Sequence, residues 1–208
     1  MTATDNEKLN FILEAARRRF GHFGLAKTTM TDIASDIGMS KASLYYYFPD
    51  KEHLFAAVIG REMDSFIEKI TALIEEPGTA GEKLRHYNKE RLLSFQQLIN
   101  LGKFSTSNID SLKPAFASLM DDFCRRENRL VEKLLDLGVR RKEFEIENIA
   151  LTAEMFTIVT RGIRALIIKQ RDSYFLNEED YATLNRHQEH FTEIFLKGIL
   201  KTNKHSNK

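Results

Sequence analysis

The sequence has little of several residue types and patterns that define common protein classes. It contains one cysteine, Cys124, which excludes an intramolecular disulfide and is typical of a reducing cytosol. Its most apolar stretch, residues 149–168, is interrupted by Glu154, Arg161 and Arg164, so we expect no membrane span. The first ten residues are polar, so we expect no secretory signal peptide and predict a cytoplasmic protein.

Motifs for catalysis and for metal or cofactor binding are also scarce. The sequence has no glycine-rich phosphate loop and no Gly-x-Ser-x-Gly motif. His187 and His190 lie three residues apart on an expected helix and could share a metal ion, but such sites take further ligands. Cys124 falls at an apolar helix position, where cysteine usually behaves as a small hydrophobic residue. We therefore predict no enzyme activity, no cofactor and no metal.

Charge gives only local support for a nucleic-acid partner. The formal net charge of +1 excludes the broad basic field of proteins that coat nucleic acid. Residues 17–51 have a modest basic excess: Arg17, Arg18, Arg19, Lys27, Lys41 and Lys51 against Asp32, Asp36 and Asp50. The arginine triplet could lie near a DNA backbone or form an ordinary solvated helix surface.

Residues 31–51, TDIASDIGMSKASLYYYFPDK, predict two short helices joined by a tight turn. The apolar residues of the first helix share one face. Gly38 follows, where a helix often ends in a residue of positive φ. Ser40 is a suitable N-cap for a second helix at 41–48, which Pro49 ends. This arrangement is the helix-turn-helix.

The second of these helices divides its side chains between two environments. Leu44 and Phe48, four residues apart, form the expected core pair. The three consecutive tyrosines that separate them cannot all be buried on so short a helix. Small residues followed by hydroxylated aromatic residues suit a helix that enters a DNA groove and contacts the flanking phosphates. Alternatively, the tyrosines only cover a small core and keep their hydroxyls in water.

Residues 20–54 resemble the DNA-binding signature of the TetR family of bacterial transcriptional regulators. The matching residues are Phe20, Gly24, Thr28, Thr29, Ile33, Ala34, Gly38, Ser40, Lys41, Leu44, Tyr45, Tyr46, Tyr47, Phe48, Lys51 and Leu54. The rest of the chain resembles the family only in length and helical character. The resemblance implies an all-α fold with an N-terminal three-helix DNA-binding domain (residues 1–50) and a larger helical effector-binding and dimerisation domain (residues 51–208).

Apolar periodicity along the chain predicts about nine helices. They lie near residues 7–23, 30–37, 41–48, 51–74, 84–101, 104–112, 116–137, 147–169 and 178–200. Gly138 is expected to end the seventh.

The resemblance also implies which residues touch DNA. Base-edge or groove contacts are expected from Ser43, Tyr45 and Lys41, and Ala42 is also expected among the DNA-binding residues. Phosphate contacts are expected from Thr28, Thr29, Met30 (through its backbone), Ser40, Tyr46, Tyr47 and Lys51. Either threonine could instead serve only as a helix cap.

The helix at 147–169 is apolar over more than one face, so one side can pack inside its own subunit while the other meets a second copy. By resemblance, the last two helices form a four-helix dimer interface. The predicted interface residues are Thr157, Thr160, Arg164, Leu184, Gln188, Phe191 and Phe195. The alternative is a thick core of a monomer.

Aromatic and methionine residues of the middle helices suit a cavity for an apolar or aromatic small molecule. They are Phe66, Tyr87, Phe95, Phe104, Phe116, Met120, Phe123, Met155 and Phe156. Alternatively, they form only an ordinary core. By resemblance, effector entry shifts the long helix at 51–74 and changes the spacing of the two recognition helices, which is a population shift.

The sequence therefore predicts a ligand-responsive DNA-binding regulator: a repressor released from a palindromic double-stranded DNA operator by a small apolar or aromatic molecule. An activator could share every residue named above. The alternative is an α-helical enzyme or protein-interaction module that retains the helix-turn-helix only for packing. That alternative predicts that the helix at 41–48 is covered by other parts of the protein. It also predicts no salt-dependent retention on DNA.

Overall fold

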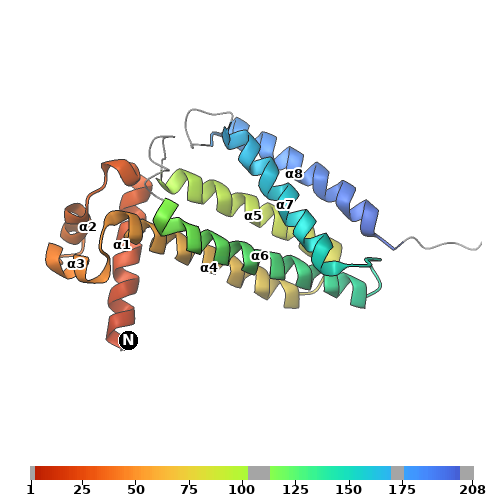
Figure 1. Ribbon diagram of the computed structural model, residues 1–208, viewed down its shortest axis with the longest axis horizontal. Helices are drawn as coiled ribbons and strands as arrows, with labels where there is room; N and C mark the ends of the chain where they lie inside the picture. Colours follow the sequence, from red (N-terminus) through yellow and green to blue (C-terminus); the bar gives the residue numbers. More distant parts are fainter. Residues whose placement is uncertain (1–2, 103–112, 170–175, 202–208) are drawn as a thin grey trace, which may run out of the picture. The chain divides into compact units, whose positions relative to one another are not determined.

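A computed structural model describes residues 3–102, 113–169 and 176–201 (Figure 1). Eight helices account for most of these residues: α1 (Ala3–Lys27), α2 (Met30–Asp36), α3 (Lys41–Tyr47), α4 (Lys51–Glu75), α5 (Ala80–Gly102), α6 (Lys113–Arg140), α7 (Ile149–Lys169) and α8 (Glu178–Ile199). The only β pairing within these ranges is an isolated bridge between Phe144 and Leu200. The predicted all-α fold is confirmed. About nine helices were predicted, and the described residues contain eight. The remaining one, predicted at 104–112, lies outside the described residues.

The chain forms two compact units. Unit 1 comprises Met1–Ser65, Ser94–Phe123 and Gln170–Asn177. Unit 2 comprises Phe66–Leu93, Cys124–Lys169 and Glu178–Lys208. Helices α4, α5 and α6 each contribute residues to both units. The boundary predicted near residue 50 concerns function, and it stays a prediction.

Helix α1 holds the apolar centre of the N-terminal region. Ile12, Ala16 and Phe20 are fully buried, and the Phe20 ring meets the Phe55 ring edge-on, with centroids 4.9 Å apart. The helix is interrupted at Gly24, whose φ of 78° and ψ of 167° favour glycine over residues with a Cβ. This break lies next to the predicted helix end at residue 23, and a further helical turn leads on to Lys27.

Helix α6 does not end at Gly138, contrary to the prediction. The helix continues to Arg140, and the backbone carbonyl of Gly138 accepts hydrogen bonds from the N–H groups of Glu143 and Phe144. A Cβ at position 138 would lie 2.1 Å from Cδ2 of Phe144. The glycine is therefore required by the ring that packs on it, not by a helix end, and sequence periodicity alone does not separate these two uses.

Unit 2 is built around a buried lysine and a row of aromatic rings. Lys83 Nζ donates to the carbonyl oxygens of Leu73 (2.7 Å), Glu76 and Pro77, which closes the C-terminal end of α4.

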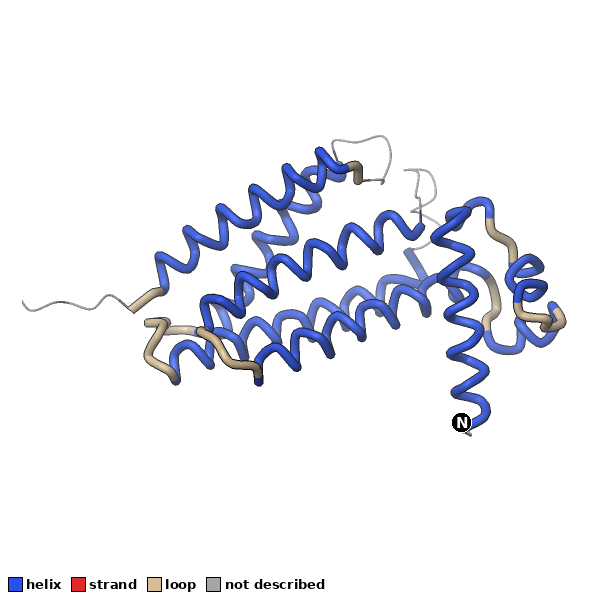
Figure 2. Tube along the Cα trace, turned by 180° about the vertical axis from the view of Figure 1, so that it is seen from behind, coloured by secondary structure: helices blue, strands red, loops and turns tan. Residues whose placement is uncertain are grey.

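Helices α7 and α8 pack side by side (Figures 1 and 2). Figure 2 shows the described chain as helices joined by loops. In the part of the chain that the structure describes, no helix has both the length and the hydropathy needed to cross a bilayer.

Candidate nucleic-acid interface and buried polar cluster

A capping box fixes the start of α2. The Thr29 hydroxyl accepts from the Asp32 N–H (3.2 Å) and donates to Asp32 Oδ2 (2.8 Å), and the Thr29 N–H donates to the same oxygen (3.1 Å). These hydrogen bonds from Thr29, with a smaller contribution from the charge of Arg19, hold the pKa of the Asp32 carboxyl below its usual value. The predicted N-cap therefore orients α2, and its hydroxyl is already engaged within the protein.

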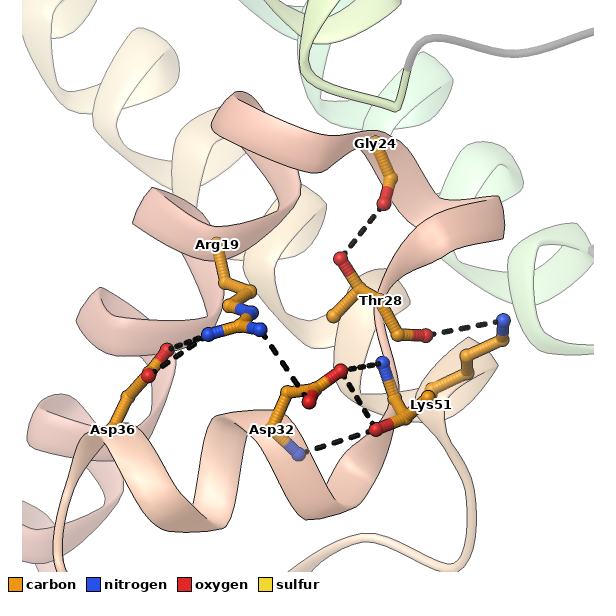
Figure 3. Close-up of polar contacts among 7 residues, drawn as sticks. Arg19, Gly24, Thr28, Asp32, Asp36 and Lys51 are labelled. Atoms are coloured by element: carbon orange, nitrogen blue, oxygen red, sulfur yellow. Dashed lines mark hydrogen bonds and ion pairs between the residues drawn. The ribbon is translucent and has the colours of Figure 1, made fainter.

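Arg19 ties α1 to both ends of α2, as Figure 3 shows. Its Nη1 lies 2.9 and 3.0 Å from the two carboxylate oxygens of Asp36, and its Nη2 lies 3.4 Å from Asp32 Oδ1. Arg17 and Arg18 pair with Glu14 at 3.5 and 3.7 Å. All three arginines of the triplet thus have carboxylate partners within the protein. Arg19 joins α1 to α2, whereas the pair of Arg18 with Glu14 lies within α1.

The turn into α3 follows the predicted pattern. Gly38 has a φ of 63°, and the Met39 N–H donates to the Ala34 carbonyl at 2.9 Å. Ser40 caps α3, since its hydroxyl accepts from the Ser43 N–H at 3.1 Å. Leu44 turns inward and is fully buried.

The opposite side of α3 is open to solvent. We call Lys41, Ala42, Ser43, Tyr45 and Tyr46 the reading face, because all five are exposed. Tyr46 is 86% exposed and Tyr45 is 42% exposed. The Lys41 ammonium lies 5.7 Å from the centroid of the Tyr45 ring. The reading helix is therefore not covered by any described part of the chain, which is the opposite of what the packing-only alternative predicts.

A groove of about 440 Å³ borders the reading face. It is lined by Lys8, Met39, Ala42, Ser43, Tyr46 and Tyr47. Tyr47 is half-buried, and its ring meets that of Tyr46 edge-on with centroids 5.4 Å apart. Sequence reasoning did not find Lys8, because it precedes α3 by more than thirty residues and only the packing of α1 brings it to this groove.

Like Thr29 and Ser40, the predicted phosphate ligands Thr28 and Lys51 have partners within the protein. Thr28 is fully buried, and its hydroxyl donates to the Gly24 carbonyl at 2.8 Å (Figure 3). Lys51 Nζ donates to the carbonyl oxygens of Leu25 (3.1 Å) and Thr28 (3.3 Å). The last carbonyls of a helix lack intrahelical partners and attract cations, so Lys51 serves as a C-terminal cap of α1. The Met30 side chain is also buried, which leaves only its backbone for the predicted contact.

The predicted effector residues divide between the two units. Phe66, Tyr87 and Phe156 come together in unit 2, where the Tyr87 ring lies 6.0 Å from Phe66 and 6.3 Å from Phe156, centroid to centroid. Phe95, Phe116, Met120 and Phe123 belong to unit 1. Met155 is exposed on α7, and Phe104 lies outside the described residues.

A buried polar cluster accompanies the aromatic residues of unit 2. We define it as Tyr87 and Arg91 of α5, Glu127 of α6 and Arg164 of α7, each at most 5% exposed. The Tyr87 hydroxyl donates to Glu127 Oε1 at 2.9 Å, and Arg91 Nε donates to the same oxygen. Sequence reasoning missed Arg91 and Glu127, although charged residues within apolar helical stripes were a usable signal.

The pKa values of three side chains of the cluster, Glu127, Tyr87 and Arg164, are shifted by their surroundings. Burial raises the pKa of Glu127, but the charges of Arg91 and Arg164 outweigh it, so the pKa lies below its usual value. Burial, followed by the nearby charge of Glu127, raises the pKa of Tyr87 well above its usual value, which keeps the phenol a donor. Burial and then repulsion from Arg91 lower the pKa of Arg164 to about 10.

Most of the predicted dimer residues face inward instead. Five are buried within unit 2: Thr157, Thr160, Arg164, Leu184 and Gln188. Phe191 and Phe195 are half-buried, with ring centroids 5.6 and 4.7 Å from that of Phe156. The exposed apolar residues of these helices are others: Leu151, Met155, Ile158 and Leu166 of α7 and Ile194 of α8. Periodicity revealed two apolar faces on α7 without showing which one is internal.

Comparison with known proteins agrees with this architecture. Residues 12–58, which run from α1 into α4, match the family model for bacterial regulatory proteins of the tetR family. The crystal structure of a transcriptional regulator from Cytophaga hutchinsonii ATCC 33406 is 39% identical in sequence to this chain. The similarity covers 93% of this chain and 99% of that one, with a TM-score of 0.86.

The chain belongs to the TetR family.

Two curated relatives match this TetR-family chain over about a third of its length. The transcriptional regulator RutR of Escherichia coli K12 is 39% identical over 69 residues, which are 33% of this chain and 32% of RutR. The transcriptional repressor Rv1474c of Mycobacterium tuberculosis is 33% identical over 70 residues, or 34% of this chain and 35% of Rv1474c. The chain thus matches about a third of the length of these two relatives.

Proposed function

We propose that this TetR-family regulator is a homodimeric repressor that binds a palindromic DNA operator and leaves it when a small molecule binds. The observation that carries the proposal is the reading face of α3: the caps and core residues of this helix are satisfied internally, while Lys41, Ala42, Ser43, Tyr45 and Tyr46 face solvent. The repressor Rv1474c, which is related over 34% of this chain, supports repression over activation. We infer action in the cytoplasm, through binding and not catalysis.

Within the reading face, side chains differ in what they can recognise. Ser43 and Lys41 carry short or flexible polar groups that can reach base edges, and Tyr45 lies beside them. Tyr46 is 86% exposed, and with Ser40 and Tyr47 it suits the phosphates beside the groove. Thr28 and Lys51 contribute by holding the loop before α2 in place.

DNA binding is tested with fluorescence anisotropy on a duplex selected by the protein from random sequences and on an unrelated duplex. We expect Tyr46→Ala to weaken binding to both by roughly tenfold, because a hydrogen bond to a charged group is lost. Ser43→Ala should change the preference between duplexes. Equal effects of the two variants on both duplexes would contradict the division of roles.

The salt dependence of the same measurement separates the proposal from its alternative. Because DNA binding releases counterions, the affinity of the wild-type protein should fall steeply with rising salt. An enzyme or interaction module that keeps the helix-turn-helix for packing would show no such retention on DNA.

We propose that the dimer forms through the exposed apolar residues of α7 and α8 defined above. Two reading helices must lie one or more DNA turns apart to bind both halves of a palindrome, so a second copy is the expected occupant of this face. Light scattering after size exclusion tests this. Ile158→Glu should give a monomer at micromolar concentration, and Lys133→Glu on the exposed side of α6 is the control. A wild-type monomer would overturn the proposal.

A further inference from the structure

We propose that Lys8 of α1 contacts a backbone phosphate of the operator, so that the DNA-binding surface extends from α3 across the bordering groove to α1. The inference rests on the proposed function and deepens it, because it adds a residue and a helix to the DNA contacts. Neither the helix-turn-helix pattern nor the family match, which begins at residue 12, includes this lysine.

The groove beside α3 brings Lys8 to the reading face. Its lining combines α1, α3 and the turn between α2 and α3, all within unit 1. Met39 and Tyr47 of this lining are half-buried, whereas Lys8, Ser43 and Tyr46 are exposed. The half-buried residues give the groove mainly apolar surface, and the exposed ones give it an ammonium group and hydroxyl groups.

The charge of the groove favours an anion. Lys8 is basic, and none of the described residues that line the groove is acidic. Asp5 and Glu7 are close to Lys8 in sequence, but neither belongs to the lining. An anion in the groove would therefore meet an ammonium group without a carboxylate beside it. When α3 enters a DNA groove, the anion that comes nearest is the phosphate backbone.

Lys8 can make this contact without giving up a partner. Its side chain is exposed, and it forms no ion pair within the described residues. The arginines of the same helix differ: Arg17 and Arg18 lie 3.5 and 3.7 Å from Glu14, and Arg19 lies 2.9 Å from Asp36. A phosphate would have to compete with these carboxylates for an arginine, whereas it would find Lys8 unpaired.

The dimensions of DNA place a backbone beside α3. The major groove is roughly 12 Å wide, and a helix with its side chains is about 10–12 Å in diameter, so a helix in the groove has a sugar–phosphate backbone along each side. The apolar surface of Met39 and Tyr47 suits deoxyribose carbons, and Lys8 and Tyr46 can donate to phosphate oxygens. Backbone contacts fix the register of a protein on the duplex and carry no base information. Lys8 is thus expected to add affinity for every sequence alike.

Fluorescence anisotropy at several salt concentrations tests the role of Lys8 in the full-length protein. We expect Lys8→Gln to weaken binding to the selected and the unrelated duplex alike, by roughly tenfold. The slope of log affinity against log salt should fall by about 0.9 for each phosphate contact that is lost. Lys8→Arg should restore most of the affinity, since guanidinium also binds phosphate. Lys133→Gln, the same charge change at an exposed position of α6, is the control and should match wild type.

Duplexes with single uncharged methylphosphonates locate the contacted phosphate. In the wild-type protein, replacing that phosphate should lower affinity. In Lys8→Gln the same replacement should have no further effect, because the contact is already lost, whereas Lys133→Gln should respond like wild type. The midpoint of urea denaturation, measured on the same samples, should be equal in all variants because Lys8 and Lys133 are both exposed.

The role of Lys8 is refuted if Lys8→Gln and Lys133→Gln have the same affinity and salt slope, or if no phosphate replacement couples to Lys8. A loss confined to the selected duplex would also refute it, because that result indicates base readout. Failure of the proposed function gives a different result, in which the wild-type protein binds neither duplex. If the wild type binds with steep salt dependence and Lys8→Gln is unaffected, only the role of Lys8 is wrong.

Discussion

The helix-turn-helix and the polar cluster use the same kinds of side chain in opposite surroundings. Arg19, Asp32 and Asp36 pair on a partly exposed surface, whereas Arg91 and Glu127 pair at most 5% exposed. Exposed ion pairs add little to the free energy of unfolding, so those of Arg19 chiefly orient α2. None of these pairs involves α3. Buried charges are costly to desolvate, so the pair in unit 2 depends on its mutual attraction and its hydrogen bonds. The comparison teaches that surroundings, not residue type, decide what a charged side chain does.

Removing the central carboxylate should have the largest effect on stability. Glu127→Leu leaves the buried guanidiniums without this counter-charge, and we expect a loss of about 3–5 kcal/mol in the free energy of unfolding. Urea denaturation measures it. Glu68→Leu, at an exposed position of α4, is the control, with a change of no more than about 0.5 kcal/mol. If both variants lose equally little, the contrast between the two regions is wrong.

The pH dependence of stability gives a smaller effect with a defined sign. The folded-state pKa of Glu127 lies below the usual glutamate value of 4.5, so its ionised form stabilises the fold above that pH. The contribution is lost as the pH falls below 4.5 and through the folded-state pKa. We therefore expect the difference in unfolding free energy between wild type and Glu127→Gln to shrink over this window. A difference that stays constant with pH would show that the charge of Glu127 is not what stabilises the fold.

Loss of the α2 cap should cost less. Thr29→Ala removes the side chain of the capping box, and we expect about 1 kcal/mol less stability, with Thr29→Ser close to wild type. Thr31→Ala, two residues further along and also exposed, is the matched control for urea denaturation. Equal losses in Thr29→Ala and Thr31→Ala would argue against the cap.

The smallest effect is expected at the surface of α1. Arg18 has a side chain that is 63% exposed and pairs with Glu14 at 3.7 Å, so Arg18→Ala should change stability by no more than about 0.5 kcal/mol. Anisotropy on the selected duplex then shows whether Arg18 also meets DNA. A drop in DNA affinity without a loss of stability would reassign the triplet from helix support to phosphate contact.

Local signals in the sequence were sufficient for the helix-turn-helix. Gly38, Ser40 and Pro49 act through their own backbone geometry or through neighbours a few residues away, so their effects can be read without tertiary structure. Leu44 and the exposed tyrosines follow from the helical period in the same way. The helix end predicted at Gly138 was wrong. This glycine is needed because the Phe144 ring packs against it, and local sequence rules do not reveal that contact.

Contacts between residues far apart in the sequence could not be predicted from local patterns. Lys51 was expected to contact a phosphate, but its ammonium donates to the carbonyl oxygens of Leu25 and Thr28 at the end of α1. Glu127 and Arg91, thirty-six residues apart, become partners only when α5 packs on α6. The inner face of α7 was mistaken for the outer one because both are apolar.

The sequence by itself determined the all-α class, the helix-turn-helix and the side of α3 that faces solvent, because these depend on periodicity, caps and turns within a few residues. Only the tertiary structure decided which charges are buried and which apolar face of α7 is exposed. It also decided which predicted phosphate ligands form hydrogen bonds within the protein. The physical reason is that a side chain's environment is set by neighbours from distant helices, and the free energy of a charge depends on that environment far more than on its place in the chain.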